Sequence, residues 1–204
     1  MDSIGKSRVR TQRDKLDLIN YYYGGYIAWC IDNDRKQDAE SYIEKSELLI
    51  SELERSRYEL STLYAYKAAF IGFNLGLSPY KAPFIGPQSI SYARRSVEID
   101  PKNPFAVLQL GNISYYTPGV FGGSKKEAMQ HYLKALSLME QQVHQTVTNW
   151  NYLNIFPTVI MAYMEQGEYN KARYYCERAL TIEPRFTWVR NNIYPEVLKQ
   201  VKHE

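Results

Sequence analysis

The sequence has little of the residue types that hold metals or act as nucleophiles. Its 204 residues include two cysteines and three histidines. Cys30 and Cys176 form no CxxC pair, and His131, His144 and His203 are far apart along the chain. No HExxH motif or carboxylate cluster accompanies them, so no metal site is expected. The two cysteines are expected to be buried free thiols at helix-packing positions.

Motifs for phosphate binding and covalent catalysis are missing as well. The chain has no glycine-rich loop of Walker or Rossmann spacing and no GxSxG sequence. The stretch from Phe121 to Ser124 precedes a predicted helix, but its glycines are best explained by a turn that needs positive φ. No catalytic residue and no cofactor are therefore predicted, and the protein is expected not to be an enzyme.

Strong charge and long apolar runs are also absent. The net charge is +3, with acidic and basic residues mixed, which is too small to indicate nucleic-acid binding. No run approaches 18 apolar residues, so no membrane span is predicted. The N-terminus has a charged start and no apolar run behind it. We therefore expect a cytoplasmic protein, or a periplasmic one if a signal peptide has been removed, with residues 1–12 forming a solvated arm.

Tyrosine is the residue type in excess, with 19 copies. Hydrophobic residues make up 45% of the chain and charged residues 23%, which is typical of a folded protein rather than a disordered one. Tyrosine supplies a large apolar ring and one polar group, which suits both helix packing and adaptable recognition surfaces. The composition therefore predicts a folded chain whose aromatic residues serve packing and binding.

A helical-repeat pattern lies near the C-terminus. Large and small residues recur there at fixed spacing, at Phe156, Val159, Ile160, Tyr163, Gly167, Tyr169, Ala172, Cys176, Ala179, Leu180, Ile182 and Pro184. This run resembles the tetratricopeptide repeat (TPR), with Ile in place of the signature Gly and Cys in place of the Phe. The resemblance extends over about residues 56–184. It implies a right-handed superhelix of antiparallel helix pairs with a concave groove lined by the first helix of each pair.

The middle of the chain repeats itself. Gly72 and Gly111 are 39 positions apart (111 − 72), and the same shift maps Ser78-Pro79 onto Thr117-Pro118. Both segments have the same insertion in the turn between their two helices, which is typical of a solenoid. Gly72 and Gly111 are expected to let helix backbones approach closely. Gly24-Gly25, inside the predicted first helix, is expected to do the same.

We predict an all-α fold, a TPR-like solenoid in one domain over residues 13–204. Its parts are helix pairs at about 13–55, 56–100, 104–142 and 150–183 and a cap at 185–202, which Pro195 divides. Capping boxes at Ser56–Glu59 and Ser124–Glu127 are predicted to start helices. Pro79 and Pro83 are expected to prevent helix, with Pro87 in the first turn of the next one. Pro157 is expected to lie in a first turn or to kink its helix.

The resemblance also places residues on the concave groove. Those residues are mostly apolar or aromatic: Tyr66, Phe73, Leu77, Phe105, Leu108, Asn112, Tyr115, Tyr116, Met161, Met164 and Glu165. Such a surface suits a protein or peptide partner. A groove filled by the protein's own terminal helix or loops is an equally open interpretation.

Two further alternatives remain from the sequence. The turn from Tyr115 to Ser124 resembles one in bacterial envelope TPR proteins, including those associated with TRAP-type transporters. That resemblance implies a small apolar ligand framed by the inserted turns near Pro79–Gly86 and Pro118–Ser124. The other alternative is an assembly subunit whose groove is closed by self-association; the sequence does not specify an oligomeric state.

Overall fold

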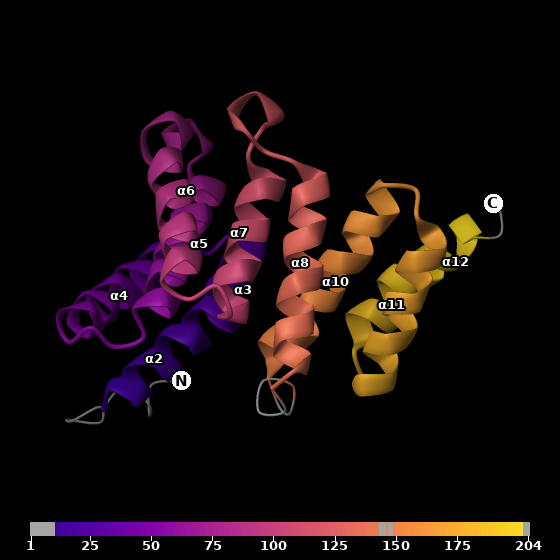
Figure 1. The fold of residues 1–204 in the computed structure, drawn as a ribbon, viewed down its shortest axis with the longest axis horizontal. Helices are drawn as coiled ribbons and strands as arrows, with labels where there is room; N and C mark the ends of the chain where they lie inside the picture. The colour runs from indigo at the N-terminus through magenta and orange to yellow at the C-terminus, as the bar shows by residue number, and fades with distance from the viewer. Residues whose placement is uncertain (1–10, 143–145, 147–148, 202–204) are drawn as a thin grey trace. The chain divides into compact units, whose positions relative to one another are not determined.

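The computed structural model describes residues 11–142, 146 and 149–201, and within these ranges it contains helices and turns but no strand (Figure 1). The predicted all-α class is confirmed. The chain divides into two compact units, residues 1–109 and 110–204. Whether the two form one domain, as the sequence predicts, stays a prediction. Residues 1–10 of the expected N-terminal arm lie outside the described residues.

Unit 1 contains the first two predicted helix pairs. Its elements are α2 (Gln12–Tyr21), η1 (Tyr22–Ile27), α3 (Ala28–Asp32), α4 (Lys36–Arg55), α5 (Leu60–Leu77), η2 (Pro79–Lys81), α6 (Ala82–Ile99) and the start of α7 (Pro104–Tyr116). A capping box opens α2, because the Thr11 side chain accepts a hydrogen bond from the Asp14 backbone N–H and Asp14 accepts one from the Thr11 N–H. The first pair therefore starts close to its predicted position.

The first helix of unit 1 is irregular where the sequence has its two adjacent glycines. Residues Tyr22–Ile27 form a π-helical segment between α2 and α3. A Cβ on Gly25 would meet no atom within 4 Å, so close helix approach does not explain this glycine. The expectation of a close approach is wrong at Gly25. An exposed glycine without a packing role lowers helix propensity, which accords with the local departure from α-helical geometry.

The predicted capping box at Ser56 is wrong. Ser56 ends α4, and its hydroxyl donates to the carbonyl of Leu53 at 2.8 Å. Arg57 and Glu59 both have positive φ, 54° and 48°, so the chain makes a tight turn before α5 starts at Leu60. A capping box needs a residue with extended backbone directly before the helix. The residue before α5 is Glu59, whose backbone is left-handed, so no capping box forms.

The proline expectations for α6 are partly wrong. Pro79 starts the short 3-10 helix η2, but α6 already begins at Ala82 and includes Pro83 and Pro87. Pro83 is tolerated because the N–H groups of a first helical turn have no intrahelical partner. Pro87 is inside the helix rather than in its first turn. The proline pattern therefore predicts the start of α6 about one helical turn later than the structure has it.

Unit 2 contains the third and fourth pairs and the cap. Its elements are the end of α7, η3 (Gly119–Phe121), α8 (Lys125–Glu140), α10 (Trp150–Glu165), α11 (Tyr169–Ile182), η4 (Val189–Ile193) and α12 (Tyr194–Val201). Ser124 caps α8, because its hydroxyl accepts from the Glu127 N–H at 3.2 Å, which confirms the predicted start. Pro157 lies inside α10. The cap changes from π-helical in η4 to α-helical in α12 just before Pro195, and its backbone stays helical across this point.

Each unit has its own apolar core. In unit 1 the fully buried side chains include those of Ile19, Ile27, Ile43, Ile50, Leu53, Leu63 and Phe70, and in unit 2 those of Tyr132, Met139, Ile155, Phe156 and Ile160. Cys30 and Cys176 are buried free thiols, as predicted. Burial raises the pKa of the Cys176 thiol to about 12, which keeps it protonated and unreactive at neutral pH. The helices of the described ranges include none that is long and apolar enough to cross a membrane.

Candidate functional site

The predicted groove of unit 1 is occupied by the chain itself. The ring of Tyr23, from the N-terminal helix, contacts four aromatic rings, with centroid distances of 5.6 Å to Tyr66, 6.4 Å to Phe70, 5.6 Å to Phe73 and 5.3 Å to Phe105. Edge-to-face and tilted pairs of this kind stabilise beyond the area they bury. Three of the predicted groove residues, Tyr66, Phe73 and Phe105, therefore contact the ring of Tyr23.

Hydrogen bonds hold the same N-terminal segment in place. The Tyr66 hydroxyl donates to Asn20 at 3.0 Å, and the buried Gln109 amide donates to the Tyr23 hydroxyl at 2.9 Å. Tyr66 is only 3% exposed, and burial raises its pKa well above the ordinary value. Phe105 and Leu108 are buried as well, whereas Phe73 and Leu77 are half-buried. Of the two interpretations left open by the sequence, a groove filled by a terminal helix accords better with unit 1.

In unit 2 a polar cluster joins three helices. The Tyr115 hydroxyl, at the end of α7, donates to one carboxylate oxygen of Glu165 at the end of α10. Lys125, at the start of α8, donates to the other oxygen. The Lys125 ammonium also lies 5.2 Å from the centre of the Tyr115 ring. Tyr115 and Glu165 are both predicted groove residues, and the structure brings their side chains together.

The cluster shifts the pKa values of its members in opposite directions. The hydrogen bond from Lys125, followed by that from Tyr115, lowers the pKa of Glu165. Desolvation, followed by the hydrogen bond to Glu165, raises the pKa of Tyr115. Tyr115 is therefore a neutral donor and Glu165 a charged acceptor at neutral pH, which is the stronger type of hydrogen bond.

Apolar side chains remain on the surface beside this cluster. Met161, one helical turn before Glu165, is 44% exposed, and Tyr116 is exposed with its ring against that of Tyr115 at 5.0 Å. We call the set Tyr115, Tyr116, Met161, Met164 and Glu165 the α7–α10 surface. The remaining predicted residue, Asn112, accepts a hydrogen bond from the Tyr132 hydroxyl at 3.1 Å, which gives it a role in packing.

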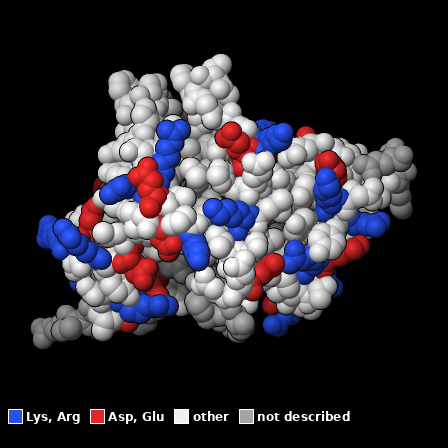
Figure 2. All heavy atoms as spheres, viewed as in Figure 1, with Lys and Arg blue, Asp and Glu red and all other residues white. Residues whose placement is uncertain are grey.

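The two inserted turns expose large apolar side chains that the sequence analysis did not single out. In the turn before and into α6, Phe84 is 82% exposed and Tyr80 is similarly open. In the turn between α7 and α8, Val120 is 88% exposed and Phe121 is also open, and the turn forms an uncharged lobe in Figure 2. For Val120 and Phe121 the signal was present in the sequence, because apolar residues between Pro and Gly in a turn have no helix face to pack against.

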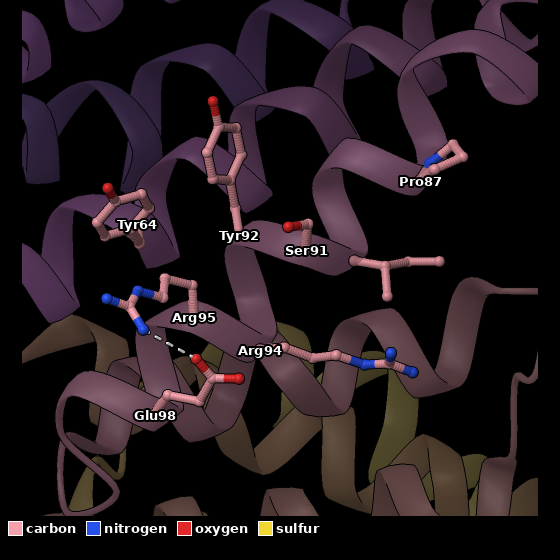
Figure 3. A pocket seen from close by; sticks show the side chains of 8 residues that line it. Tyr64, Pro87, Ser91, Tyr92, Arg94, Arg95 and Glu98 are labelled. Atoms are coloured by element: carbon pink, nitrogen blue, oxygen red, sulfur yellow. Dashed lines mark hydrogen bonds and ion pairs between the residues drawn. The ribbon is translucent and has the colours of Figure 1, made fainter.

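A cavity of about 370 Å³ lies against α5 and α6 in unit 1 (Figure 3). Its lining includes Tyr64, Tyr92, Arg94, Arg95 and Glu98. Arg95 is paired with Glu98 at 3.1 Å, and Arg94 extends in the opposite direction from Arg95 (Figure 3). Ligand sites usually have a few polar groups that converge on one point. The polar groups of this cavity do not converge.

A second cavity, of about 590 Å³, lies in unit 2 beside Glu140 and Tyr152. The Tyr152 hydroxyl donates to Glu140 at 3.1 Å, and Arg178 is ion-paired with the same carboxylate. Desolvation is the main reason that the pKa of Tyr152 rises to about 12. The Arg178 guanidinium also lies 5.6 Å from the Phe156 ring. These groups satisfy one another, which indicates a packing role for the cluster. No three His, Cys, Asp or Glu residues gather into a possible metal site anywhere in the described ranges.

Comparisons with known proteins support the repeat resemblance. Residues 161–186 match the tetratricopeptide repeat family, and these residues cover the last five residues of α10 and all of α11. No curated protein matches the sequence. A search of solved structures finds the HusA haemophore from Porphyromonas gingivalis, with a TM-score of 0.61, 19% sequence identity and coverage of 80% of each chain. At that identity the likeness shows a shared helical fold.

Proposed function

We propose that this chain, which contains a tetratricopeptide repeat, is a non-catalytic scaffold that binds a peptide segment of a protein partner on the α7–α10 surface. Repeats of this kind are typical of proteins that use extended helical surfaces for binding rather than for catalysis. The first helices of consecutive pairs line the groove in the family, and α7 and α10 are the first helices of the third and fourth pairs.

The observation that carries the proposal is the link between Tyr115 and Glu165. It fixes the ends of α7 and α10 together and leaves Tyr116 and Met161 exposed beside a charged cluster. An exposed tyrosine is a common anchor of protein interfaces, and methionine adapts its shape to different apolar partners. Lys125 and Glu165 would then provide the polar rim that fixes the orientation of a peptide.

The proposal is tested by affinity purification from the source organism with wild type and the double variant Tyr116→Ala/Met161→Ala. A matched control, Tyr21→Ala/Leu48→Ala, removes exposed apolar side chains from unit 1. We expect that one partner protein from the organism is retained both by wild type and by the control variant. Its purified form should bind the double variant at least about tenfold more weakly, because two interface anchors are removed. Equal binding by all three proteins, with unchanged helicity, would contradict the proposal.

A second candidate function is the binding of a planar apolar small molecule such as a porphyrin. The likeness to a haemophore favours it, together with the exposed aromatic side chains of the inserted turns. Titration with haemin and with metal-free protoporphyrin should then give a saturable shift of the Soret absorption at one ligand per chain. A linear, unsaturable change would exclude this candidate and would leave the peptide proposal unaffected.

A further inference from the structure

The turn between α4 and α5 in unit 1 is strained at two residues. Among the described residues, three that are not glycine have positive φ, and two of them, Arg57 at 54° and Glu59 at 48°, lie in this turn. The Cβ of either residue crowds the backbone in the left-handed region, so this conformation costs free energy twice. Glu59 also precedes α5 without a side-chain hydrogen bond to the helix N-terminus. The turn therefore persists because the elements that it joins are packed together.

Equivalent turns of the chain have residues that tolerate this conformation better. After α10 the left-handed residue is Gly167, and after α3 it is Asp34. Glycine has no Cβ, and aspartate enters the left-handed region more often than most residues do. In each of these turns the next N–H donates to a carbonyl five positions earlier, as the Tyr58 N–H does to Leu53. The turn at residues 56–59 is thus the one where the strain is concentrated.

The sequence allows an open form of this turn. The chain has no glycine and no proline from Lys36 to Ile71, so α4, the turn and α5 can join in one continuous helix. Joining them gives Arg57 and Glu59 right-handed backbone and provides carbonyl partners for the first N–H groups of α5. The same movement takes the first helix pair, residues 11–55, away from α5.

The contacts that opening breaks hold the first pair against α5. They are an aromatic contact, a hydrogen bond and an ion pair: Tyr23 with Tyr66, Tyr66 with Asn20, and Lys67 with Glu54. Each contact has one partner in the first pair and the other in α5. A second copy of the chain, opened in the same way, offers the same partners, so two copies together regain every contact without the strained turn.

We infer that two copies of this chain exchange their first helix pairs, residues 11–55, by opening the turn at residues 56–59, so that the Tyr23 ring of each copy covers α5 of the other. The surface is matched to this occupant, because it holds the identical segment within one chain. The inference does not depend on the proposed function, since it uses residues of unit 1 alone.

Light scattering after size-exclusion chromatography measures the exchange. The full chain is refolded from urea at low and high concentration, and we expect a dimer whose share rises with concentration. Arg57→Gly/Glu59→Gly should lower the dimerisation constant at least about tenfold, because glycine adopts the left-handed turn easily and weakens a continuous helix. Asp34→Gly is the matched control and should dimerise like wild type, because its turn lies inside the exchanged pair.

Two native ion pairs distinguish this exchange from an ordinary dimer. Glu54 and Lys67 are 13 positions apart, which is about 20 Å along a continuous helix, so in the exchanged dimer their ion pair joins two chains. Lys15 and Glu52, paired at 2.8 Å, both belong to the first pair and stay in one chain. The test is carbodiimide cross-linking of a co-refolded mixture of unlabelled and isotope-labelled protein, followed by mass spectrometry. The Glu54–Lys67 product should combine both labels, and the Lys15–Glu52 product should contain one.

Three results would overturn the inference. One is a chain that stays monomeric at every concentration, and another is a dimer whose Glu54–Lys67 product contains one label only. The third is a glycine double variant that dimerises as wild type does, or an Asp34→Gly variant that loses the dimer to the same extent as the double variant, because the chain would then not open at residues 56–59.

Discussion

The ring of Tyr132 lies 2.7 Å from the point where a Cβ on residue 111 would stand. Tyr132 is fully buried in α8, and Gly111 is in the facing helix α7. The ring therefore uses the space that the missing side chain leaves. Gly72, its equivalent in the preceding repeat, is exposed, and a Cβ there would meet no atom within 4 Å. Gly111 therefore has a packing role, but it makes room for a side chain and not for the close backbone approach that was expected; at Gly72 the expectation is wrong.

Gly111→Ala should destabilise the protein by about 1–3 kcal/mol. The added methyl would overlap the ring of the buried Tyr132, and overpacking of a core costs this much. Urea unfolding followed by circular dichroism measures the change. An unfolding midpoint equal to that of wild type would show that the Tyr132 ring can move aside.

Gly72→Ala is the matched substitution and should act in the opposite direction. Gly72 lies inside α5 at an exposed position with open space, so alanine should raise the stability by about 0.5–1 kcal/mol through helix propensity. The same urea experiment tests it. A loss of stability would mean that the glycine has a packing role.

Gly123→Ala should disrupt the turn between α7 and α8. A Cβ on Gly123 would lie 1.6 Å from the Thr117 carbonyl oxygen, which is a backbone atom and cannot rotate away. We expect a loss of at least about 2 kcal/mol and a local increase in amide exchange over this turn. Gly119→Ala is the control, because its Cβ would meet nothing within 4 Å and it should change stability by less than about 0.5 kcal/mol.

Tyr23→Ala should lower the stability of unit 1 by about 2–3 kcal/mol, because it removes a ring that contacts four others. Tyr23→Phe retains the ring and loses the hydrogen bond from Gln109, which should cost about 1 kcal/mol. Chemical denaturation of the two variants separates the contributions. Equal losses for both would assign the stability to the hydroxyl and not to the ring contacts.

Glu165 should make stability depend on acid pH. Its pKa is lowered in the folded protein relative to the ordinary value of 4.5, so its stabilising contribution is present above about pH 4.5 and is lost as the pH falls through the folded pKa. Glu165→Gln should therefore be less stable than wild type at pH 7, by at most about 1 kcal/mol for so exposed a group.

Melting temperatures between pH 7 and pH 3 measure this effect. Wild type should melt at a higher temperature than Glu165→Gln at pH 7. This difference should shrink as the pH falls below about 4.5, because protonation of Glu165 removes its stabilising contribution. Glu98→Gln, which breaks an exposed pair with Arg95 within one helix, is the control. A difference that stays constant over the whole range would show that protonation of Glu165 is not coupled to folding.

The helix pairs could be predicted from the sequence because small and large residues recur with the period of a repeat. The start of α8 was predictable for a local reason, since Ser124 and Glu127 are three positions apart at a helix start. The start of α5 was not, because Ser56 and Glu59 have the same spacing but are part of a turn with positive φ. Spacing alone cannot distinguish a helix start from the turn after a helix.

The candidate site was less predictable than the fold. A repeat pattern shows which face of a helix is concave, but not what covers that face. Tyr23 is 43 positions from Tyr66 and lies outside residues 56–184, over which the repeat resemblance extends, so its contacts had no signature in the sequence. The Tyr115–Glu165 bond likewise joins two repeats. Contacts between repeats depend on how the pairs stack, which a single sequence does not specify.

The position of Tyr23 in the chain has a consequence for biosynthesis. Tyr23 is translated before Tyr66, Phe70, Phe73 and Phe105, the rings that it contacts in the finished protein. When α5 leaves the ribosome, the helix that covers it is already available, since chains fold from the N-terminus during synthesis. The apolar rings of α5 can therefore be covered while the rest of the protein is still being made, which limits the time in which they could associate with other nascent chains.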